Sequence, residues 1–292
     1  MVPEIEKMLK FPWQNLEGFM RLWLDEDLGR GDITTESLGL EGCIVDAEVV
    51  AKSDGIVCGV PGFQRIMSKM IDDMLIDHTL PDGSEFRAGD SIIRFSGSAS
   101  GILSAERTAL NLLNHLSGIS TLTGKFVKKV EGTKARIYDT RKTIPGWRAL
   151  QKYAVSCGGG ENHRVDLSEL VMLKDNHLEL IGGMIDDEIM RIKGIIGNSV
   201  KVEVEVRTVE MALRAANAGA DIIMLDNMTP DEGREVVRLL GDKVIIEASG
   251  GINLDNVRAW AEAGVDMISI GALTHSAPSA DLSLDIRERR DS

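Results

Sequence analysis

In the second half of the chain, short apolar runs rich in β-branched residues alternate with stretches of helical periodicity. This alternation predicts strands that are separated by helices. The six predicted strands are Arg136–Tyr138, Leu170–Leu173, Val202–Val206, Asp221–Leu225, Lys243–Glu247 and Asp266–Ile270. Thr208–Ala218 and Leu254–Ala263 are predicted amphipathic helices. Thr229, Pro230 and Glu232 supply a capping box, with proline at the first position of a third helix. Such βα units pair their strands in parallel, with right-handed crossovers.

The run Val202–Val206 favours a barrel over an open sheet. Its valines alternate with Glu203 and Glu205, so a period of two places both carboxylates on one face. If the valines face outer helices, the glutamates point into the centre of a closed barrel. Six strands between about residues 118 and 272 are fewer than the eight of a full barrel, which needs roughly 250 residues. The predicted fold is therefore α/β, with an incomplete six-stranded (β/α) barrel.

Residues 1 to about 117 lack this rhythm and are predicted to form a separate α+β domain. Its predicted helices are Leu16–Asp27, Gly62–Ile71 and Ser104–Leu116. Its predicted strands include Ile44–Ala51 and Ser91–Phe95. Of the 292 residues, 43% are hydrophobic, which is enough for a sizeable core. We place the N-terminal domain at 1–117, the barrel with the active site at 118–274 and a C-terminal tail at 275–292.

Charge and cysteine content exclude several classes of partner. The chain has 33 Lys and Arg against 46 Asp and Glu, a net charge of −13, so we expect neither nucleic acid nor anionic lipid to bind it. We expect no membrane span or export signal, since no apolar run approaches ~20 residues and the N-terminus lacks a signal-peptide pattern. Cys43, Cys58 and Cys157 are far apart and form no CxxC pair. They fit reduced thiols in the cytoplasm better than disulfides or a zinc site.

Polar residues follow every predicted barrel strand. They are Asp139–Lys142, Lys174–His177, Glu205, Asp226–Asn227, Ser249–Gly251 and Gly271–Ala272. A single polar residue at a strand end is commonly a turn former. Six in succession favour an active site, because loops at the carboxyl ends of barrel strands hold it.

Residues 134–177 hold eight Lys or Arg and five Asp or Glu, a local balance of +3 in an acidic chain. This basic cluster indicates an anionic ligand with phosphates or carboxylates, although a solvated helix face is the alternative. Arg141 and Lys142 favour a ligand site because they come directly after a strand. His163 and Arg164 follow the run Gly158–Gly160, which we expect to let the backbone approach a ligand.

The later strand ends suggest a phosphate site and a metal site. Ser249, Gly250 and Gly251, with Gly271 and Ala272, follow the last two strands, where barrels commonly bind a phosphate. Glu205 and Asp226 are candidate oxygen ligands of a divalent ion such as Mg²⁺, which a phosphorylated substrate normally carries. The alternative for these two carboxylates is salt bridges to the basic cluster.

Lys174 and Cys157 are weaker candidates. Lys174 suits either a Schiff-base lysine, as in barrel aldolases, or an anion clamp. Cys157 fits a small buried residue better than a nucleophile, because no neighbouring base is evident.

Several ordered motifs resemble the quinolinate phosphoribosyltransferase family, also called carboxylating nicotinate-nucleotide pyrophosphorylase. The motifs are Glu26–Gly29, Gly31–Thr35, Ala105–Asn111, Asp139–Arg148, Lys152–Val155, Gly158–Arg164, Lys174–His177, Val202–Val206, Leu225–Asn227, Ala248–Gly251 and Ser269–Ser276. The stretches around Ser168, Glu169 and Arg207 differ from the family pattern. The resemblance implies an α/β-sandwich N-terminal domain, a six-stranded incomplete barrel and a C-terminal tail that returns to the first domain.

The resemblance also implies an activity. The family joins quinolinate to 5-phosphoribosyl 1-diphosphate with magnesium, and it yields nicotinate mononucleotide, diphosphate and CO₂ in NAD biosynthesis. It further implies a homodimer with shared active sites, and it leaves open whether dimers assemble further.

Site roles can be carried over residue by residue. The implied quinolinate ligands are Arg107, from the neighbouring subunit, with Arg141, His163, Arg164 and Lys174. Lys142 would meet the diphosphate, and Glu205 and Asp226 the magnesium-bound ribose diphosphate. The loops at Ser249–Gly251 and Gly271–Ala272 would hold the 5-phosphate. Of these residues, Lys142, Lys174, Glu205 and Asp226 are the expected catalytic ones.

Three rival functions are distinguishable. A paralogue associated with molybdenum transport shares the fold and parts of the motifs, but the intact run from Arg141 to Lys174 disfavours it. A barrel aldolase would form a Schiff base at Lys174. A pure binding role would leave Glu205 and Asp226 beside an anion site without a purpose.

Overall fold

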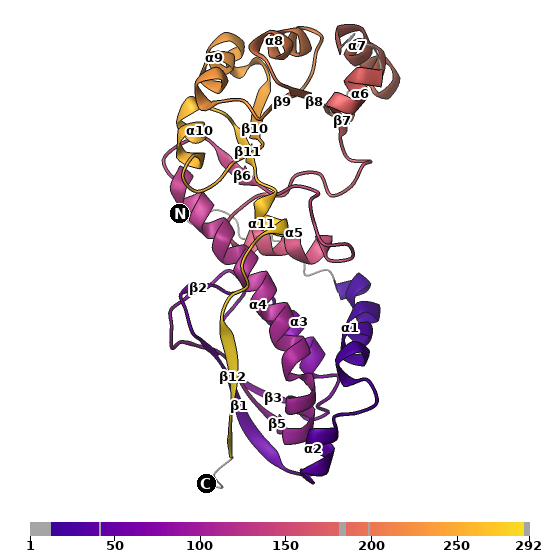
Figure 1. The fold of residues 1–292 in the computed structure, drawn as a ribbon, viewed down its shortest axis with the longest axis vertical. Coiled ribbons are helices and arrows are strands. Elements are labelled where there is room, and N and C mark those ends of the chain that lie inside the picture. The colour runs from indigo at the N-terminus through magenta and orange to yellow at the C-terminus, as the bar shows by residue number, and fades with distance from the viewer. Residues whose placement is uncertain (1–12, 41, 181–184, 198, 289–292) are drawn as a thin grey trace. The chain divides into compact units, whose positions relative to one another are not determined.

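The computed structural model describes residues 13–40, 42–180, 185–197 and 199–288, which divide into two compact units (Figure 1). Unit 1 comprises the chain up to Gly124, Ala149–Gly159 and the chain from Ala277 onward. Unit 2 comprises Lys125–Arg148 and Gly160–Ser276. The units are thus discontinuous in sequence, whereas the domain boundaries at 117/118 and 274/275 were drawn on a continuous chain. Those boundaries stay predictions.

Unit 1 is built on an antiparallel sheet of four strands. The order is β12 (Leu282–Glu288), β1 (Ile44–Ala51), β5 (Ser91–Ser98) and β3 (Leu75–Thr79). Every second residue of β1 is buried, as period two requires. The pairing of β12 with β1 brings the last described strand back to unit 1. A small second sheet joins β2 (Gly55–Ile56) to β4 (Glu85–Phe86).

The helices of unit 1 cover this sheet and connect to the rest of the chain. They are α1 (Trp13–Leu28), α2 (Ile33–Ser37), α3 (Val60–Met67), most of α4 (Ala99–Val130) and α5 (Arg148–Cys157). Phe63 of α3 meets Phe95 of β5 edge to face at 5.9 Å between ring centroids, which fixes α3 on the sheet. The helix predicted at Ser104–Leu116 is part of the longer helix α4. Helix α5 was not predicted.

Unit 2 contains a sheet of six parallel strands. In spatial order they are β6 (Arg136–Tyr138), β11 (Met267–Ser269), β10 (Ile245–Ser249), β9 (Ile222–Asp226), β8 (Val202–Val206) and β7 (Val171–Leu173). Among the described residues, the end strands β6 and β7 do not pair with each other. The predicted incomplete six-stranded barrel is confirmed, and every predicted strand end lies within two residues of the observed one.

Helices follow the strands of unit 2 and cover the outer side of the sheet (Figure 1). They are α6 (Asp175–Leu180), α7 (Ile185–Ile196), α8 (Val209–Asn217), α9 (Pro230–Leu240), α10 (Val257–Ala263) and α11 (Ala272–His275), with a 3-10 turn at Gly241–Lys243. The capping box of α9 forms as predicted, between the Thr229 and Glu232 side chains and backbones. A Cβ at Gly233 would lie 2.6 Å from the Trp260 ring, so glycine lets α9 pack closely on α10.

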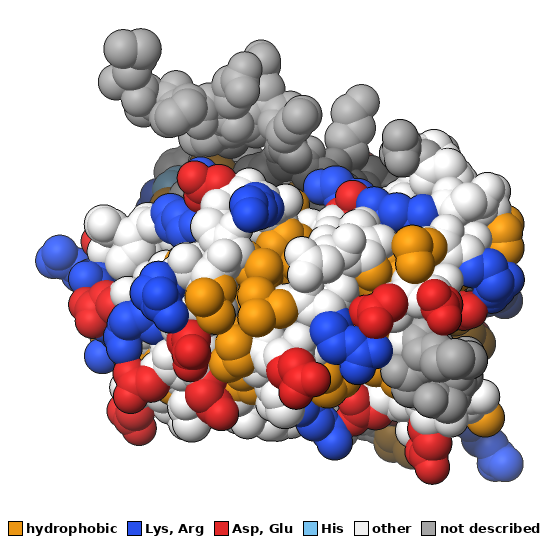
Figure 2. All heavy atoms as spheres, turned by 90° about the horizontal axis from the view of Figure 1, so that it is seen from above, with side chains coloured by type: hydrophobic (Ala, Val, Ile, Leu, Met, Phe, Trp, Pro, Cys, Tyr) orange, Lys and Arg blue, Asp and Glu red, His pale blue; other side chains and the backbone are white. Residues whose placement is uncertain are grey.

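One face of the molecule carries mixed charge. On the face that Figure 2 shows, basic and acidic side chains are interspersed, with hydrophobic side chains between them. Among the helices that the structure describes, none has both the length and the apolar character that crossing a bilayer requires.

Candidate active site

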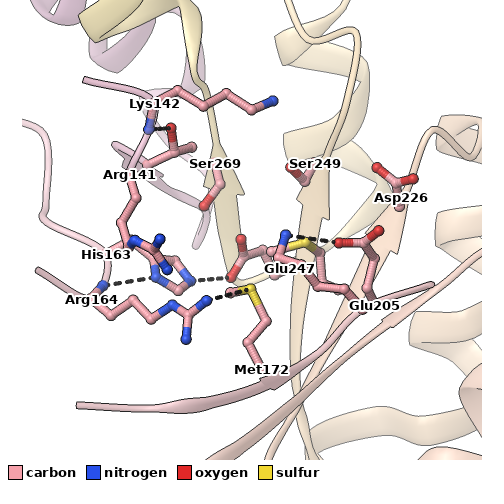
Figure 3. Close-up of a pocket in the computed structure, with 13 residues that line it drawn as sticks. Arg141, Lys142, His163, Arg164, Met172, Glu205, Asp226, Glu247, Ser249 and Ser269 are labelled. Atoms are coloured by element: carbon pink, nitrogen blue, oxygen red, sulfur yellow. Dashed lines mark hydrogen bonds and ion pairs between the residues drawn. The ribbon is translucent and has the colours of Figure 1, made fainter. Parts of the chain in front are cut away.

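A cavity of about 390 Å³ opens among the carboxyl ends of the parallel strands, and all of its lining comes from unit 2 (Figure 3). It is lined by Thr140, Arg141, Lys142, His163, Arg164, Met172, Lys174, Glu205, Met224, Asp226, Glu247, Ser249 and Ser269. Eight of the predicted site residues therefore meet at one place: Arg141, Lys142, His163, Arg164, Lys174, Glu205, Asp226 and Ser249.

One side of the cavity, here called the basic wall, consists of Arg141, Lys142, His163 and Arg164 (Figure 3). The loop after β6 is held at Lys142, whose backbone N–H donates to Thr140 and whose carbonyl accepts from the Thr274 hydroxyl at 2.7 Å. Arg164 donates to the carbonyl of Leu170 at 2.8 Å. These backbone contacts fix the cations in position without neutralising them.

The two arginines of the basic wall have no carboxylate ion pair within the described part of the chain. Arg164 donates hydrogen bonds to a backbone carbonyl and to the sulfur of Met172. Nε of Arg141 is buried without a hydrogen-bond partner among the described groups. Burial, and then the charge of Arg141, lower the pKa of Arg164. An anion placed here would relieve this repulsion and satisfy the open donors.

At the base of the basic wall, His163 lies against two buried carboxylates of the barrel interior. Its Nε2 lies 3.2 Å from Glu247 and 3.2 Å from Glu203, and its Nδ1 accepts the backbone N–H of Arg164 at 2.8 Å. Burial lowers the pKa of His163, but the two glutamates outweigh it and raise this pKa to about 10. Burial and the charge of Glu247 raise the pKa of Glu203 to about 7.

Glu247 is a site residue that sequence reasoning missed, because it was assigned only as the end of a strand. In β10 it alternates with Ile246 and Ala248, the same period-two pattern that singled out Glu203 in β8. Both glutamates are fully buried. Applying the argument used for β8 to β10 would have found it.

Glu205 and Asp226 line the opposite side of the cavity. Together with Asp175, which is not among the lining residues, they form the group that is here called the acidic wall. One carboxylate oxygen from each lies within 4.8 Å of the others. Nζ of Lys174 is 3.1 Å from Glu205. Arg207 contacts Asp175 and lies 3.5 Å from Asp226. Glu205 thus forms a salt bridge to a lysine of the basic cluster, as the second alternative predicted, and Asp226 is paired with Arg207 instead. The role of both carboxylates as metal ligands stays a prediction.

Asp175 and Arg207 are the members of this arrangement that the sequence did not assign. Asp175 stands in a predicted strand-end motif, at the first residue of α6, but it carried no predicted role. Arg207 was noted only as a departure from the family pattern.

The glycine loops after β10 and β11 lie beside the cavity without lining it. Ser249 and Ser269 line it, whereas Gly250, Gly251, Gly271 and Ala272 are not among the lining residues. Gly250 has a φ of +90°, and a Cβ there would lie 2.4 Å from Asn227, so only glycine fits this turn. The phosphate-binding role of these loops stays a prediction.

Arg107 belongs to unit 1, whereas every residue that lines the cavity belongs to unit 2. It lies on α4, its side chain is 63% exposed and it is 3.8 Å from Glu106. This contact is the salt bridge within its own helix that competes with a role in a neighbouring subunit. That role stays a prediction.

For Gly158, the first residue of the glycine run, the expected role beside a ligand is wrong, whereas for Gly159 and Gly160 it stays a prediction. A Cβ at Gly158 would lie 2.4 Å from the carbonyl oxygen of Ser120 on α4. Gly158 therefore lets the end of α5 pack against the α4 backbone, instead of opening space for a ligand. Gly159 has a φ of +83°, which ends the helix.

A second cluster lies in unit 1, where Cys58, Asp82 and Cys157 have ligand-type atoms within 4.8 Å of one another. All three cysteines of the chain are free thiols. Burial, and then the neighbouring Cys157, raise the pKa of the Cys58 thiol. Asp82 accepts the backbone N–H groups of Gly59 and Val60 and the hydroxyl of Tyr153. Because its oxygens hold the start of α3, we assign this cluster a structural role.

The fold and the cavity define a class: a two-part α/β protein with an incomplete parallel barrel and a pocket at its strand ends that is lined by cationic side chains and carboxylates. Residues 32–117 match the family model of the quinolinate phosphoribosyl transferase N-terminal domain, and residues 119–285 match that of the C-terminal domain. The chain belongs to the quinolinate phosphoribosyl transferase family.

Curated relatives and solved structures agree with this membership. A probable carboxylating nicotinate-nucleotide pyrophosphorylase of Bacillus subtilis is 41% identical over 262 residues, covering 89% of this chain and 90% of the relative. The carboxylating nicotinate-nucleotide pyrophosphorylase of Mycobacterium leprae is 37% identical and covers 91% and 95%. The solved nicotinate-nucleotide pyrophosphorylase of Francisella tularensis has a TM-score of 0.91 at 36% identity and covers 97% and 100%.

Proposed function

We propose that this chain transfers the phosphoribosyl group of 5-phosphoribosyl 1-diphosphate to quinolinate and decarboxylates the product. The products are nicotinate mononucleotide, diphosphate and CO₂, as in de novo NAD biosynthesis. One observation carries the proposal: across one cavity, two arginines without a carboxylate partner among the described residues face Glu205 and Asp226, whose carboxylates form a group with that of Asp175. Such a cavity suits an anionic acceptor on one side and a metal-bound diphosphate ester on the other.

The basic wall would bind the two carboxylates of quinolinate. Arg141 and Arg164 present planar forks that match carboxylates, and Lys174 adds a cation from the opposite side. Direct contact of His163 with a carboxylate of quinolinate stays a prediction, because both ring nitrogens of His163 already have partners within the protein. In this proposal His163 helps by fixing the backbone of Arg164.

The acidic wall fits Mg²⁺, because three carboxylate oxygens converge there and hard oxygen ligands are those that magnesium prefers. Asp175 would join Glu205 and Asp226 as a ligand or would hold a water of the ion. When bound, magnesium would neutralise the diphosphate and so favour its departure.

The side chains of the cavity would do the remaining work. Lys142, whose ammonium projects freely into the cavity in Figure 3, would stabilise the negative charge of the leaving diphosphate. Glu205 and Asp226 would place negative charge near the ribosyl carbon as it becomes cationic. The ring nitrogen of quinolinate then bonds to that carbon, and Ser249 with the glycine loops would hold the 5-phosphate.

The geometry disfavours the aldolase alternative. Lys174 is ion-paired with Glu205, and a protonated amine is not a nucleophile. The contact that opposes the Schiff base supports Lys174 as a member of the anion site.

We further propose a homodimer in which Arg107 completes the site of the neighbouring subunit, and a cytoplasmic location. The first rests on family resemblance at Ala105–Asn111, and the second is supported by three free thiols in the chain.

The deciding experiment is an assay of the purified chain with quinolinate and 5-phosphoribosyl 1-diphosphate, with and without magnesium. We expect nicotinate mononucleotide and CO₂ in equal amounts, and only with magnesium. Absence of both products in the presence of magnesium would reject the proposed function.

A further inference from the structure

Arg207 occupies a singular position in unit 2, directly after β8 and between the ends of its two neighbouring strands. Its guanidinium contacts Asp175, which follows β7, and its Nε lies 3.5 Å from Asp226, which ends β9. One cation thus spans two of the three carboxylates of the acidic wall. Its side chain is 60% exposed, so it can swing into solvent.

The charges of this wall explain why the carboxylates can lie so close together. Asp175, Glu205 and Asp226 carry three negative charges within 4.8 Å of one another. Lys174 compensates one of them at Glu205, and Arg207 is shared by the other two. Two cations therefore stand where a divalent cation would supply the same charge.

We propose that Arg207 is an internal competitor of the divalent cation for Asp175 and Asp226 and so sets how tightly the acidic wall binds it. This inference rests on the proposed function for the assignment of the wall as a magnesium site. A guanidinium and a divalent cation repel each other, and they need the same carboxylate oxygens. The guanidinium must therefore move aside when the ion binds, which an exposed ion pair permits at low cost.

A substitution of Arg207 tests this competition more specifically than a substitution of Lys174, because Lys174 also faces the anion site. Arg207 is not among the residues that line the cavity. It is therefore treated as a positioning residue that acts through the two aspartates.

The test measures cation binding directly, without substrates. Mn²⁺, a hard divalent probe, is titrated into the full chain, and free Mn²⁺ is followed by electron paramagnetic resonance. Arg207→Met keeps the length of the side chain and removes its charge. We expect its dissociation constant for Mn²⁺ to fall by up to about fivefold, the range of one exposed ion pair.

Two comparisons make the test specific. Arg214→Met removes the same charge from an exposed pair with Asp186, 2.9 Å away, and should leave Mn²⁺ affinity unchanged. In the double variant Arg207→Met with Asp175→Asn, the gain in Mn²⁺ affinity should be abolished, because the Asp175 carboxylate that loses its arginine partner is then absent. Arg207→Lys should lie between wild type and Arg207→Met.

The inference is overturned if Arg207→Met binds Mn²⁺ equally or more weakly, since Arg207 would then hold the ligands in place. An equal gain in Arg214→Met would assign the effect to net charge and also overturn it. So would a failure of every variant to bind Mn²⁺. A chain that makes no nicotinate mononucleotide but shows the Arg207 effect would reject the proposed function alone.

Discussion

The two walls of the cavity hold similar numbers of charged groups but treat them differently. On the basic wall, Arg141 and Arg164 have no carboxylate ion pair among the described residues, and only backbone and thioether groups accept from Arg164. On the acidic wall, every carboxylate has a cation within 3.5 Å. One wall is ready for an anion, whereas the other must exchange cations before it can hold a metal ion.

This difference has a physical consequence for binding. Preorganised donors bind without first breaking an internal contact, so the basic wall should discriminate strongly between ligands. The acidic wall gives up ion pairs when it binds a metal ion. Its net affinity is therefore the difference between the new contacts to the ion and the ion pairs that are lost. We therefore expect selectivity to reside mainly in the basic wall.

The largest effect is expected when the acceptor lacks one carboxylate. Nicotinate should be turned over at least about a thousandfold less efficiently than quinolinate, because a cation clamp without its partner costs several kcal/mol. Steady-state kcat/KM for the two acids, at saturating 5-phosphoribosyl 1-diphosphate and magnesium, measures this ratio. Comparable values would show that the basic wall does not read the second carboxylate.

The next effect concerns the acidic wall. Glu205→Gln and Asp226→Asn keep the side-chain shape and remove the charge. We expect binding of 5-phosphoribosyl 1-diphosphate with magnesium to weaken by about 10- to 100-fold, with quinolinate binding changed far less. Calorimetric titration with each ligand separates the two affinities. Normal turnover at limiting magnesium would mean that both carboxylates serve only as salt-bridge partners.

The same two walls show what sequence patterns could and could not reveal. Five site residues were found because each lies at or shortly after the end of a predicted strand, and parallel strands end at one edge. They are Arg141, Lys142, Lys174, Glu205 and Asp226. Those local rules also gave the six strands and the capped helix at Thr229. Position along one element was enough in each case.

Features that depend on two distant elements were missed. Arg207 matters through Asp175 and Asp226, which lie at the ends of the neighbouring strands. Gly158 was given a ligand role because its contact with Ser120 on another helix is not visible in the sequence. Composition and periodicity specify faces and ends, whereas partners across the fold need the coordinates.

A smaller effect tests whether the basic wall is completed by another chain. Arg107→Ala and Lys174→Ala chains, each nearly inactive alone, are co-expressed with different tags. In a mixed dimer, the Arg107→Ala chain keeps an intact barrel that receives Arg107 from its partner. Random pairing makes about half of the dimers mixed, each with one good site of two, so about a quarter of wild-type activity should return. No recovery in purified mixed dimers would mean that Arg107 acts within its own chain or not at all.

The smallest expected effect concerns the buried His163 of the basic wall and its neighbours Glu203 and Glu247. Burial lowers the pKa of His163, but the two glutamates raise it to about 10, above its unfolded value near 6.5. Between these values the folded chain keeps a proton that the unfolded chain has lost. Stability from this group is therefore complete below about pH 6.5 and lost as the pH rises toward 10, with a slope of at most about 1.4 kcal/mol per pH unit.

Urea unfolding at pH 7 and pH 9.5 measures this loss, with His163→Gln to remove it and exposed His275→Gln as the matched control. We expect the wild type and His275→Gln to lose stability in parallel over this interval, and His163→Gln to lose less. One contact opposes protonation of His163. The backbone N–H of Arg164 donates to Nδ1 of His163 at 2.8 Å, and this hydrogen bond must break before that nitrogen can be protonated. Equal losses in all three proteins would mean that this hydrogen bond prevails and that His163 stays neutral. The basic wall would then rest on an imidazole that orients Arg164 without adding charge to the anion site.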